Sequence, residues 1–466
     1  MPISEYITKL ITEALEKMGL SVQEFGLDHP TEFSHGDFST NVAMTLAKKM
    51  NTNPKTLAEE ITKNIASDKL VSRIEVAGPG FINFYLTNSF FEEATSKIIE
   101  QGENFGKNNL HDGKKILVEH SSPNLFKPFH VGHVMNNTIG ESIARLAEFS
   151  GAHVIKISYP SDVSLGIGKA VFALLKHGVS ELEALPDESA KLAFLGDCYV
   201  EGTKLYDADE EVQKQVRKIT EIIYENTDGI EYDTYLKGRK ITLDYFLDIT
   251  KRLGSEFHDF IYESEAGKIG EKLVRENLSK VFKTSDEAII YEGEKDGLHT
   301  RVFINKEGYP TYEAKDIGLL ALKFEKFAPD VSIVVTDRNQ AEYYKVVLAA
   351  AARLHKAWSE KTVHKTHGRM SFKGKKMSSR LGGVPIASDI LDAVCEEVAS
   401  KMKDGGNAEN IDAVAIAALK FTILKTMAGR DIDFDPEISL SFEGDSGPYL
   451  QYTNARINSV LEKAAA

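Results

Sequence analysis

Hydrophobic residues at the start of the chain recur with the period of an amphipathic helix. Over residues 2–18, one helical face collects Ile3, Ile7, Leu10, Ile11, Ala14, Leu15 and Met18. Gly19 follows this pattern and suits the left-handed residue that often ends a helix. Helical spacing also covers about 39–50 and about 54–66, so three helices are predicted in this region.

Two short apolar runs follow these helices. Residues 74–76 and 81–86 are predicted to form strands, because a Gly-Pro-Gly turn separates them. Residues 102–115 are polar and contain glycine, so they are expected to form a linker. We therefore predict a small N-terminal α+β domain over residues 1–110.

The pattern changes after the linker. Residues 116–118 form a short apolar run typical of a buried strand, about 132–149 has helical spacing, and 154–157 is a second strand-like run. A strand, a crossover helix and a strand in this order imply parallel pairing. Strand-like residues 331–335 resume the sheet, so a Rossmann-like catalytic domain is predicted over 111–385.

The remaining segments are mostly helical in pattern. Residues of about 180–300 are rich in charge and are expected to form a helical insertion within the sheet domain. Helical patterns return after residue 386, so 386–466 is predicted to be a C-terminal helical segment. The predicted fold class is α/β, with the α+β domain before it and helices after it.

Composition narrows the class of protein. The chain has 466 residues, 42% hydrophobic and 27% charged, which is typical of a soluble multidomain protein. No apolar run reaches the roughly 18 residues that span a bilayer, so no membrane partner is expected. The two cysteines, Cys198 and Cys395, are too few for a zinc motif and favour a reducing, cytoplasmic setting without a structural metal.

The net charge of −14 argues against a protein that coats nucleic acids. A local basic patch can still steer an RNA partner, and residues 365–380 contain six lysines and arginines and no acid. A solvated loop explains this patch equally well. The charge pattern therefore leaves both interpretations open.

The first chemical signature is His130-Val131-Gly132-His133, at the predicted start of a helix. Two histidines at this spacing lie on one side of a helical turn, where they can bind a metal or cap the helix. Gly132 allows a ligand to approach the backbone closely. Free N–H groups and the positive end of the helix dipole would favour a phosphate.

The sequence around this signature is more specific than the four residues themselves. Glu119, Ser121-Ser122, Pro123-Asn124 and Lys127 precede it at the spacing that resembles arginyl-tRNA synthetases. Much later, residues 374–380 (Gly-Lys-Lys-Met-Ser-Ser-Arg) are similar to the KMSKS signature of class I aminoacyl-tRNA synthetases. The resemblance covers nearly the whole chain.

The resemblance implies a site for ATP. It assigns ATP binding to His130, Gly132, His133, Lys376, Met377, Ser378 and Arg380, and catalytic roles to His130, His133, Lys376 and Lys127. Ser379 replaces the second lysine of the usual signature. The cation that meets the pyrophosphate therefore stays open, in the order of preference Lys376, Arg380, Lys127. Mg²⁺ is expected to arrive with ATP.

The resemblance also implies a pocket for free arginine. Tyr312 and Asp316 are i and i+4 on a predicted helix and share a face. By resemblance, Asp316 and Glu119 receive the guanidinium and Tyr312 covers it. The remaining contacts are assigned to Asn124 and Ser121 at the α-amino group and to Gln340.

The implied function is the ligation of arginine to tRNA through an arginyl-adenylate, by a chain expected to act as a monomer. The alternatives are another class I adenylating synthetase and a non-catalytic protein that binds tRNA or arginine. The N-terminal domain resembles the family's tRNA-contacting domain, although its glycines have an equally good structural explanation. Residues 444–452 resemble the entry to the anticodon-binding domain, so the chain is expected to lack most of that domain.

Overall fold

The computed structural model describes residues 3–21, 24–66, 69–373, 386–401 and 407–465. The chain divides into two compact units, Met1–Lys107 and Asn108–Ala466. Each unit has its own hydrophobic core. Among the described residues, no helix is long and apolar enough to cross a membrane.

The N-terminal unit is an antiparallel sheet covered by helices. Its strands follow the order β1-β2-β4-β3, and their bounds are β1 (Leu27–Asp28), β2 (Phe38–Thr40), β3 (Val71–Ala77) and β4 (Phe81–Leu86). The helices are α1 (Ile3–Lys17), α2 (Val42–Met50), α3 (Pro54–Asn64) and α4 (Asn88–Gln101). The apolar face predicted for the first helix is buried, with Ile7, Ile11 and Leu15 in the core beside Phe84.

Two predictions for this unit need correction. Residues 39–40 belong to strand β2, whose Ser39 pairs with Asn83, so the helix predicted from residue 39 begins at Val42. The sequence analysis missed α4, which has no buried residue. A helix without a buried apolar face has little of the periodic signal that identifies helices.

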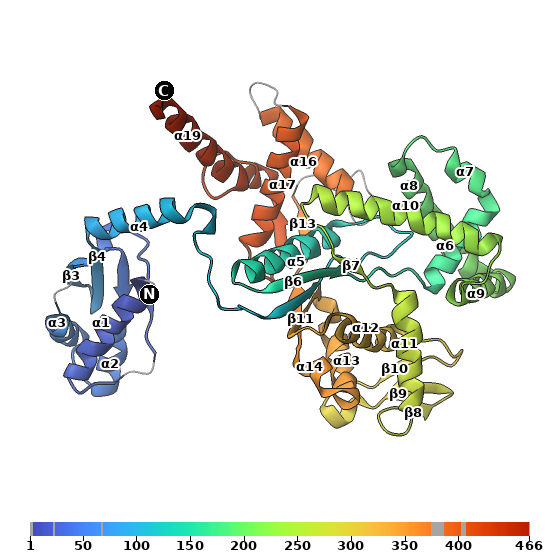
Figure 1. Cartoon of the computed structure of the whole chain (residues 1–466), viewed down its shortest axis with the longest axis horizontal. Helices are drawn as coiled ribbons and strands as arrows, with labels where there is room; N and C mark the ends of the chain where they lie inside the picture. Colours follow the sequence, from blue (N-terminus) through green and yellow to red (C-terminus); the bar gives the residue numbers. More distant parts are fainter. Residues whose placement is uncertain (1–2, 22–23, 67–68, 374–385, 402–406, 466) are drawn as a thin grey trace. The chain divides into compact units, whose positions relative to one another are not determined.

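The second unit is built on a five-stranded parallel sheet in the order β12-β11-β5-β6-β7, of which Figure 1 labels β6, β7 and β11. The strands are β5 (Lys115–Glu119), β6 (His153–Ser158), β7 (Asp259–Phe260), β11 (Val331–Asp337) and β12 (Thr362–His367). Helix α5 (Val131–Phe149) connects β5 to β6. Continuous buried apolar runs such as Ile116–Val118 are typical of parallel strands that are covered on both faces of their sheet.

Helices fill most of the stretch between β6 and β11. They are α6 (Leu165–His177), α7 (Val179–Glu183), α8 (Glu188–Ala208), α9 (Glu210–Glu225), α10 (Ile230–Arg252) and α11 (Glu263–Glu276). The helical prediction for about 180–300 needs two corrections. Strand β7 joins the main sheet through the pair Ile157↔Asp259. A small antiparallel sheet follows, made of β8 (Lys283–Ser285), β9 (Ala288–Tyr291) and β10 (Arg301–Ile304).

Helices α11 and α12 (Tyr312–Phe327) cross with almost no space between their backbones. A Cβ on Gly270 would lie 1.8 Å from the Ala314 carbonyl oxygen, and one on Gly318 would lie 1.9 Å from the Ala266 carbonyl oxygen. Only glycine fits at these two positions. The crossing fixes the first residue of α11 against the first turns of α12.

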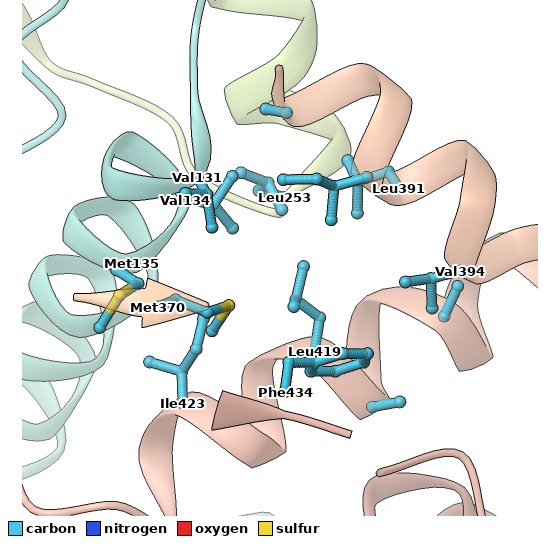
Figure 2. Close-up of a cluster of buried hydrophobic side chains, with 14 of the residues drawn as sticks. Val131, Val134, Met135, Leu253, Met370, Leu391, Val394, Leu419, Ile423 and Phe434 are labelled. Carbon is cyan, nitrogen blue, oxygen red and sulfur yellow. The ribbon is translucent and has the colours of Figure 1, made fainter. Parts of the chain in front are cut away.

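Helix α5 packs against the C-terminal helices α16 (Ala387–Lys401) and α17 (Ala408–Leu424). Figure 2 shows Val131, Val134 and Met135 of α5 pointing into one cluster with Leu391 of α16 and Leu419 of α17. The short strands β13 (Met370–Phe372) and β14 (Ile432–Phe434) contribute to the same core. The remaining described elements are α13 (Ala341–Leu354), α14 (Lys356–Glu360), α18 (Pro436–Ser439) and α19 (Gly447–Ala465). The start of α5 is therefore held by apolar packing from helices far along the chain.

Candidate active site

A cavity of about 490 Å³ opens at the carboxyl ends of β5 and β11. The connection after β5 leads to β6 on one side, whereas β11 lies on the other side of β5. The chain thus reverses its direction of strand addition between β5 and β11. Open parallel sheets bind their ligands at such a switch point.

The histidine side of the cavity consists of His130 and His133 at the start of α5. The His130 N–H donates to Nδ1 of His133 at 3.0 Å, and the Gly132 N–H donates to Nδ1 of His130 at 3.1 Å. Because each Nδ1 accepts, the proton of each neutral ring lies on Nε2. A Cβ on Gly132 would come within 2.9 Å of the His130 ring. The two histidines therefore cap the helix and keep an N–H donor each.

Both imidazoles are neutral at physiological pH. Burial lowers the pKa of His130, and the nearby Lys127 lowers that pKa further. Burial lowers the pKa of His133 well below its ordinary value, and His130 adds to the effect. The histidine side therefore offers hydrogen-bond donors and the helix dipole rather than fixed positive charge.

The acidic side of the cavity consists of Glu119, Glu263 and Asp316. Glu119 accepts a hydrogen bond from the fully buried Lys323 at 2.7 Å. Glu263 accepts one from the buried Lys315 at 2.8 Å. Both lysines lie on α12, so this helix neutralises two of the three acids.

Asp316 differs from the other two acids. Among the residues that the structure describes, it forms no ion pair, and its carboxylate accepts a hydrogen bond from the hydroxyl of Tyr343. Burial raises the pKa of Asp316 to about 8, and the neighbouring Glu119 and Glu263 contribute to the rise. A buried carboxylate without a cation is an incomplete site, which a cationic ligand would complete.

The loop from β5 to α5 is strained at two positions. Ser121 has a φ of +58° and Phe126 a φ of +63°, in the left-handed region that favours glycine. The Phe126 side chain is fully buried, with its ring stacked on Tyr235 at 6.2 Å between centroids. Such strain persists only where the surroundings over-determine the backbone, which is common at binding sites.

The structure brings most of the predicted site residues together. The predicted residues that line the cavity are Glu119, Asn124, His130, Gly132, His133, Tyr312, Asp316 and Gln340. Ser121 does not line it, because this residue is fully buried and its hydroxyl accepts from the Asn137 amide at 3.1 Å. Its neighbour Ser122 lines the cavity instead. Lys127 does not line the cavity either, and its ammonium lies 4.3 Å from the centroid of the Tyr199 ring.

The predictions for Lys376, Met377, Ser378 and Arg380 lie outside the described residues. The residues that flank this segment are described. Lys373 donates its N–H to Phe434 at 2.9 Å. Ile386 forms an antiparallel bridge with His130, and the N–H of Ala387 donates to Phe129 at 2.7 Å. The chain that follows the second signature therefore returns to the first one.

Several residues that line the cavity were not predicted from the sequence, namely Ser122, Asn136, Tyr159, Ser161, Glu263, Asp337, Tyr343 and His367. Most of them lie in elements far apart in the sequence. Asp337 could have been predicted, because it follows a predicted strand and precedes Gln340 by three residues. No local pattern distinguishes Glu263 from the many other acids of its helical stretch.

Comparison with known proteins identifies the family. The model of the class I (R) tRNA synthetase catalytic domain matches residues 94–435, and that of the arginyl tRNA synthetase N-terminal domain matches residues 5–86. The chain belongs to the arginyl-tRNA synthetase family. The arginine–tRNA ligase of Treponema pallidum is 31% identical over 451 residues, which cover 94% of this chain and 76% of the relative. That of Borreliella afzelii is 29% identical over 480 residues, covering 99% and 80%.

A solved structure supports the fold of this arginyl-tRNA synthetase family member. The arginyl-tRNA synthetase of Thermus thermophilus superposes with a TM-score of 0.72 at 23% identity, covering 99% of this chain and 82% of that one. The predicted family and the α/β fold class are confirmed. The roles of the individual site residues stay predictions.

Proposed function

We propose that this chain is an arginine–tRNA ligase, which forms arginyl-adenylate from arginine and ATP and transfers the arginyl group to the 3′-terminal adenosine of tRNA. One observation carries the proposal. A single cavity holds the buried acid Asp316, which pairs with no cation among the described residues, and two imidazole donors at the start of a helix, His130 and His133. The first suits a guanidinium and the second suits phosphates.

On the acidic side, Asp316 accepts the guanidinium of arginine through paired N–H donors. The guanidinium is a planar fork whose geometry matches a carboxylate, whereas an ammonium is a point charge that cannot use both oxygens in the same way. Tyr312 lies one helical turn before Asp316 and lines the same cavity, so its ring covers the substrate. Asn124 and Ser122 supply polar groups for the α-amino end, and Gln340 adds a further contact.

The internal lysine pairs refine this assignment. Lys323 already occupies one oxygen of Glu119, and Lys315 already occupies one oxygen of Glu263. Because each of these acids is paired with a lysine, neither adds a net charge to the cavity. On the acidic side, the ionised form of Asp316 would therefore add one negative charge, which matches the single charge of the guanidinium. Because burial raises the pKa of Asp316 to about 8, binding of the guanidinium would draw this carboxyl into its ionised form.

The first chemical step needs no general base, because the arginine carboxylate is ionised at neutral pH. This carboxylate attacks the α-phosphorus of ATP, the bond to the bridging oxygen breaks, and pyrophosphate leaves. The Nε2–H groups of His130 and His133 donate to the phosphate oxygens as charge shifts onto them. Mg²⁺ bound to the triphosphate would offset charge on the leaving pyrophosphate. The described residues contain no cluster of three metal-ligating side chains.

In the second step, a ribose hydroxyl of the terminal adenosine attacks the carbonyl carbon of arginyl-adenylate, and AMP leaves with the bonding electrons. The N-terminal unit, which matches the family's N-terminal domain, would contact the tRNA. Lys376 and Arg380, which lie in the sequence between Lys373 and Ile386, are proposed to bind the pyrophosphate. The anchoring of Ile386 at His130 supports this proposal.

The test is ATP–pyrophosphate exchange with each amino acid in turn, with and without arginine tRNA. Among the amino acids, arginine is expected to support exchange, at a rate well above the rates with lysine, glutamate or cysteine. A preference for glutamate or cysteine would support another class I adenylating enzyme. Arginine binding in calorimetry, without any exchange or aminoacylation, would support a non-catalytic binding protein.

A further inference from the structure

The strands β5 and β11 separate where the cavity begins. Their parallel ladder runs from the pair Val331↔Ile116 to the pair Val334↔Glu119, and it ends there. Beyond this point, the backbone groups that face one another across the gap need other partners, because buried N–H and C=O groups are rarely left unpaired. The side chain of Asn136, from α5, lies in this gap.

The Asn136 amide supplies the hydrogen bonds that β5 and β11 no longer form with each other beyond this point. Its Oδ1 accepts from the Ser121 N–H at 2.6 Å, on the chain that continues β5. Its Nδ2 donates to the Val335 carbonyl of β11 at 2.7 Å. One side-chain amide thus accepts from one strand and donates to the next, as a peptide group of an intervening strand would.

A third strand is tied to the same amide. Nδ2 of Asn136 lies 3.3 Å from Nε2 of His367, the last residue of β12. Nδ1 of His367 lies 2.8 Å from the Gly368 carbonyl, which can only accept, so the ring proton is on Nδ1 and Nε2 accepts. Each hydrogen bond of Asn136 therefore has a fixed direction. If the amide were flipped, its NH₂ group would face the Ser121 N–H, another donor, and its oxygen would face the Val335 carbonyl, another acceptor.

We propose that Asn136 is a positioning residue, which sets the distance between the acidic side and the histidine side by fixing the ends of three strands. The proposal rests on the proposed function. Asn136 is 9% exposed and lines the cavity between Glu119, at the end of β5, and Asp337, at the end of β11. It also holds Ser121 in the left-handed conformation from which the chain turns toward Ser122 and Asn124.

A change in this distance affects the reaction more than it affects the binding of either substrate. Arginine contacts groups on one side of the cavity, and the phosphates contact groups on the other. The reacting carboxylate and α-phosphorus belong to different ligands, so their alignment depends on how the two sides are placed. A misplacement of about 1 Å can lower a rate by about 100-fold.

The test is Asn136→Asp, which preserves shape and removes both N–H donors. Calorimetry would measure three dissociation constants, for arginine, for ATP and for the non-hydrolysable sulfamoyl analogue of arginyl-adenylate, which spans both sides. The analogue is expected to bind at least 10-fold more weakly, while arginine and ATP each change by less than 3-fold. In aminoacylation, kcat should fall 10- to 100-fold with both KM values within 3-fold.

The neighbouring residue provides a matched control. Asn137 is also a buried asparagine of α5, but its amide bonds to two hydroxyls, those of Ser121 and Ser255, both at 3.1 Å. Hydroxyls can reverse their direction, and His120, whose Nδ1 lies 2.8 Å from the Ser121 hydroxyl, can change its tautomer, so Asn137→Asp can keep both hydrogen bonds. This variant is expected to retain analogue affinity and kcat within 3-fold, at a temperature where circular dichroism shows it folded.

Asn136→Ala serves as the second variant if Asn136→Asp does not fold. Equal losses for all three ligands, wild-type analogue affinity in Asn136→Asp, or failure of both variants to fold would overturn the proposal. A further readout is the ¹⁵N spectrum of His367, in which the Asn136→Asp carboxylate should move a proton onto Nε2. A wild-type chain that does not bind the analogue would instead refute the proposed function, so the two failures are distinguishable.

Discussion

The acidic side and the histidine side of the cavity present opposite solutions to the burial of polar groups. On the acidic side, Glu119 and Glu263 form hydrogen bonds with Lys323 and Lys315, and Asp316 has no such partner among the described residues. On the histidine side, neutral rings are fixed by backbone N–H groups within one helical turn. The acidic side depends on distant parts of the chain, whereas the histidine side depends on local geometry.

The largest effect is expected where the acidic side depends on its buried lysine. Lys323→Met leaves Glu119 buried without a partner, which costs about 3–5 kcal/mol of stability. Urea unfolding followed by the fluorescence of Trp358, the one tryptophan of the chain, reports on the second unit.

The matched control for this variant is Lys326→Met. Lys326 lies one turn along the same helix and forms an exposed pair with Asp259, so its loss should cost no more than about 1 kcal/mol. Adding Glu119→Gln to Lys323→Met should recover part of the stability. Equal midpoints for Lys323→Met and Lys326→Met would mean that the buried pair adds nothing to the fold.

The histidine side is tested by a change that keeps the helix cap. In His133→Gln, the amide oxygen can still accept from the His130 N–H, as glutamine does in a capping box, while the imidazole Nε2–H is replaced by amide N–H groups that the shared amide carbon directs away from its position. The loss of one preorganised donor is expected to lower kcat for adenylate formation by about 100- to 1,000-fold. Rapid-quench measurement of arginyl-adenylate gives this rate. Unfolding midpoints of His133→Gln and the wild type should agree, and an unchanged rate would remove His133 from the reaction.

The third prediction concerns Asp316, the carboxyl of the cavity that forms no ion pair with a described residue. Asp316→Asn should weaken arginine binding by about 100-fold, because a charged hydrogen bond is replaced by a neutral one, and should leave ATP binding within about 3-fold. Calorimetry with each ligand measures both. Glu313→Gln is the control on the same helix, since Glu313 pairs with Arg301 and does not line the cavity. Equal losses of arginine and ATP affinity in Asp316→Asn would contradict the assignment of the acidic side.

The same comparison explains what the sequence could predict. The histidine side was accessible, because His130 and His133 act within one turn of one helix and their spacing encodes that geometry. Tyr312 and Asp316 were accessible for the same reason. The pairs Glu119–Lys323 and Glu263–Lys315 were not, since they join residues 204 and 52 positions apart. Only the order of the strands and the close crossing of α11 and α12 bring these charges together.

The fold shows a similar division. The parallel sheet and the helix α5 follow from apolar runs and helical spacing, which are local signals. Strand β7 has only two residues, too few for any period to be detected, although it completes the main sheet. Ser121 illustrates the same limit at the site. Its hydroxyl was expected to face the substrate, but the left-handed φ of +58° directs its polar atoms into the protein and leaves Ser122 at the cavity.

The smallest expected effect is a pH dependence that belongs to the acidic side alone. Burial raises the pKa of Asp316 to about 8 in the empty cavity, so most molecules are protonated there at pH 6 to 7. Only the ionised carboxylate binds the guanidinium, so arginine affinity should rise about 10-fold from pH 6 to pH 7 and level off above pH 8. Burial lowers the pKa of His133 well below its ordinary value and also lowers that of His130, so neither imidazole gains a charge as the pH rises. Calorimetry at several pH values should give this slope for the wild type and none for Asp316→Asn; a slope that persists in Asp316→Asn would assign the titration to another group, and a flat wild-type profile would mean that Asp316 is already ionised before arginine binds.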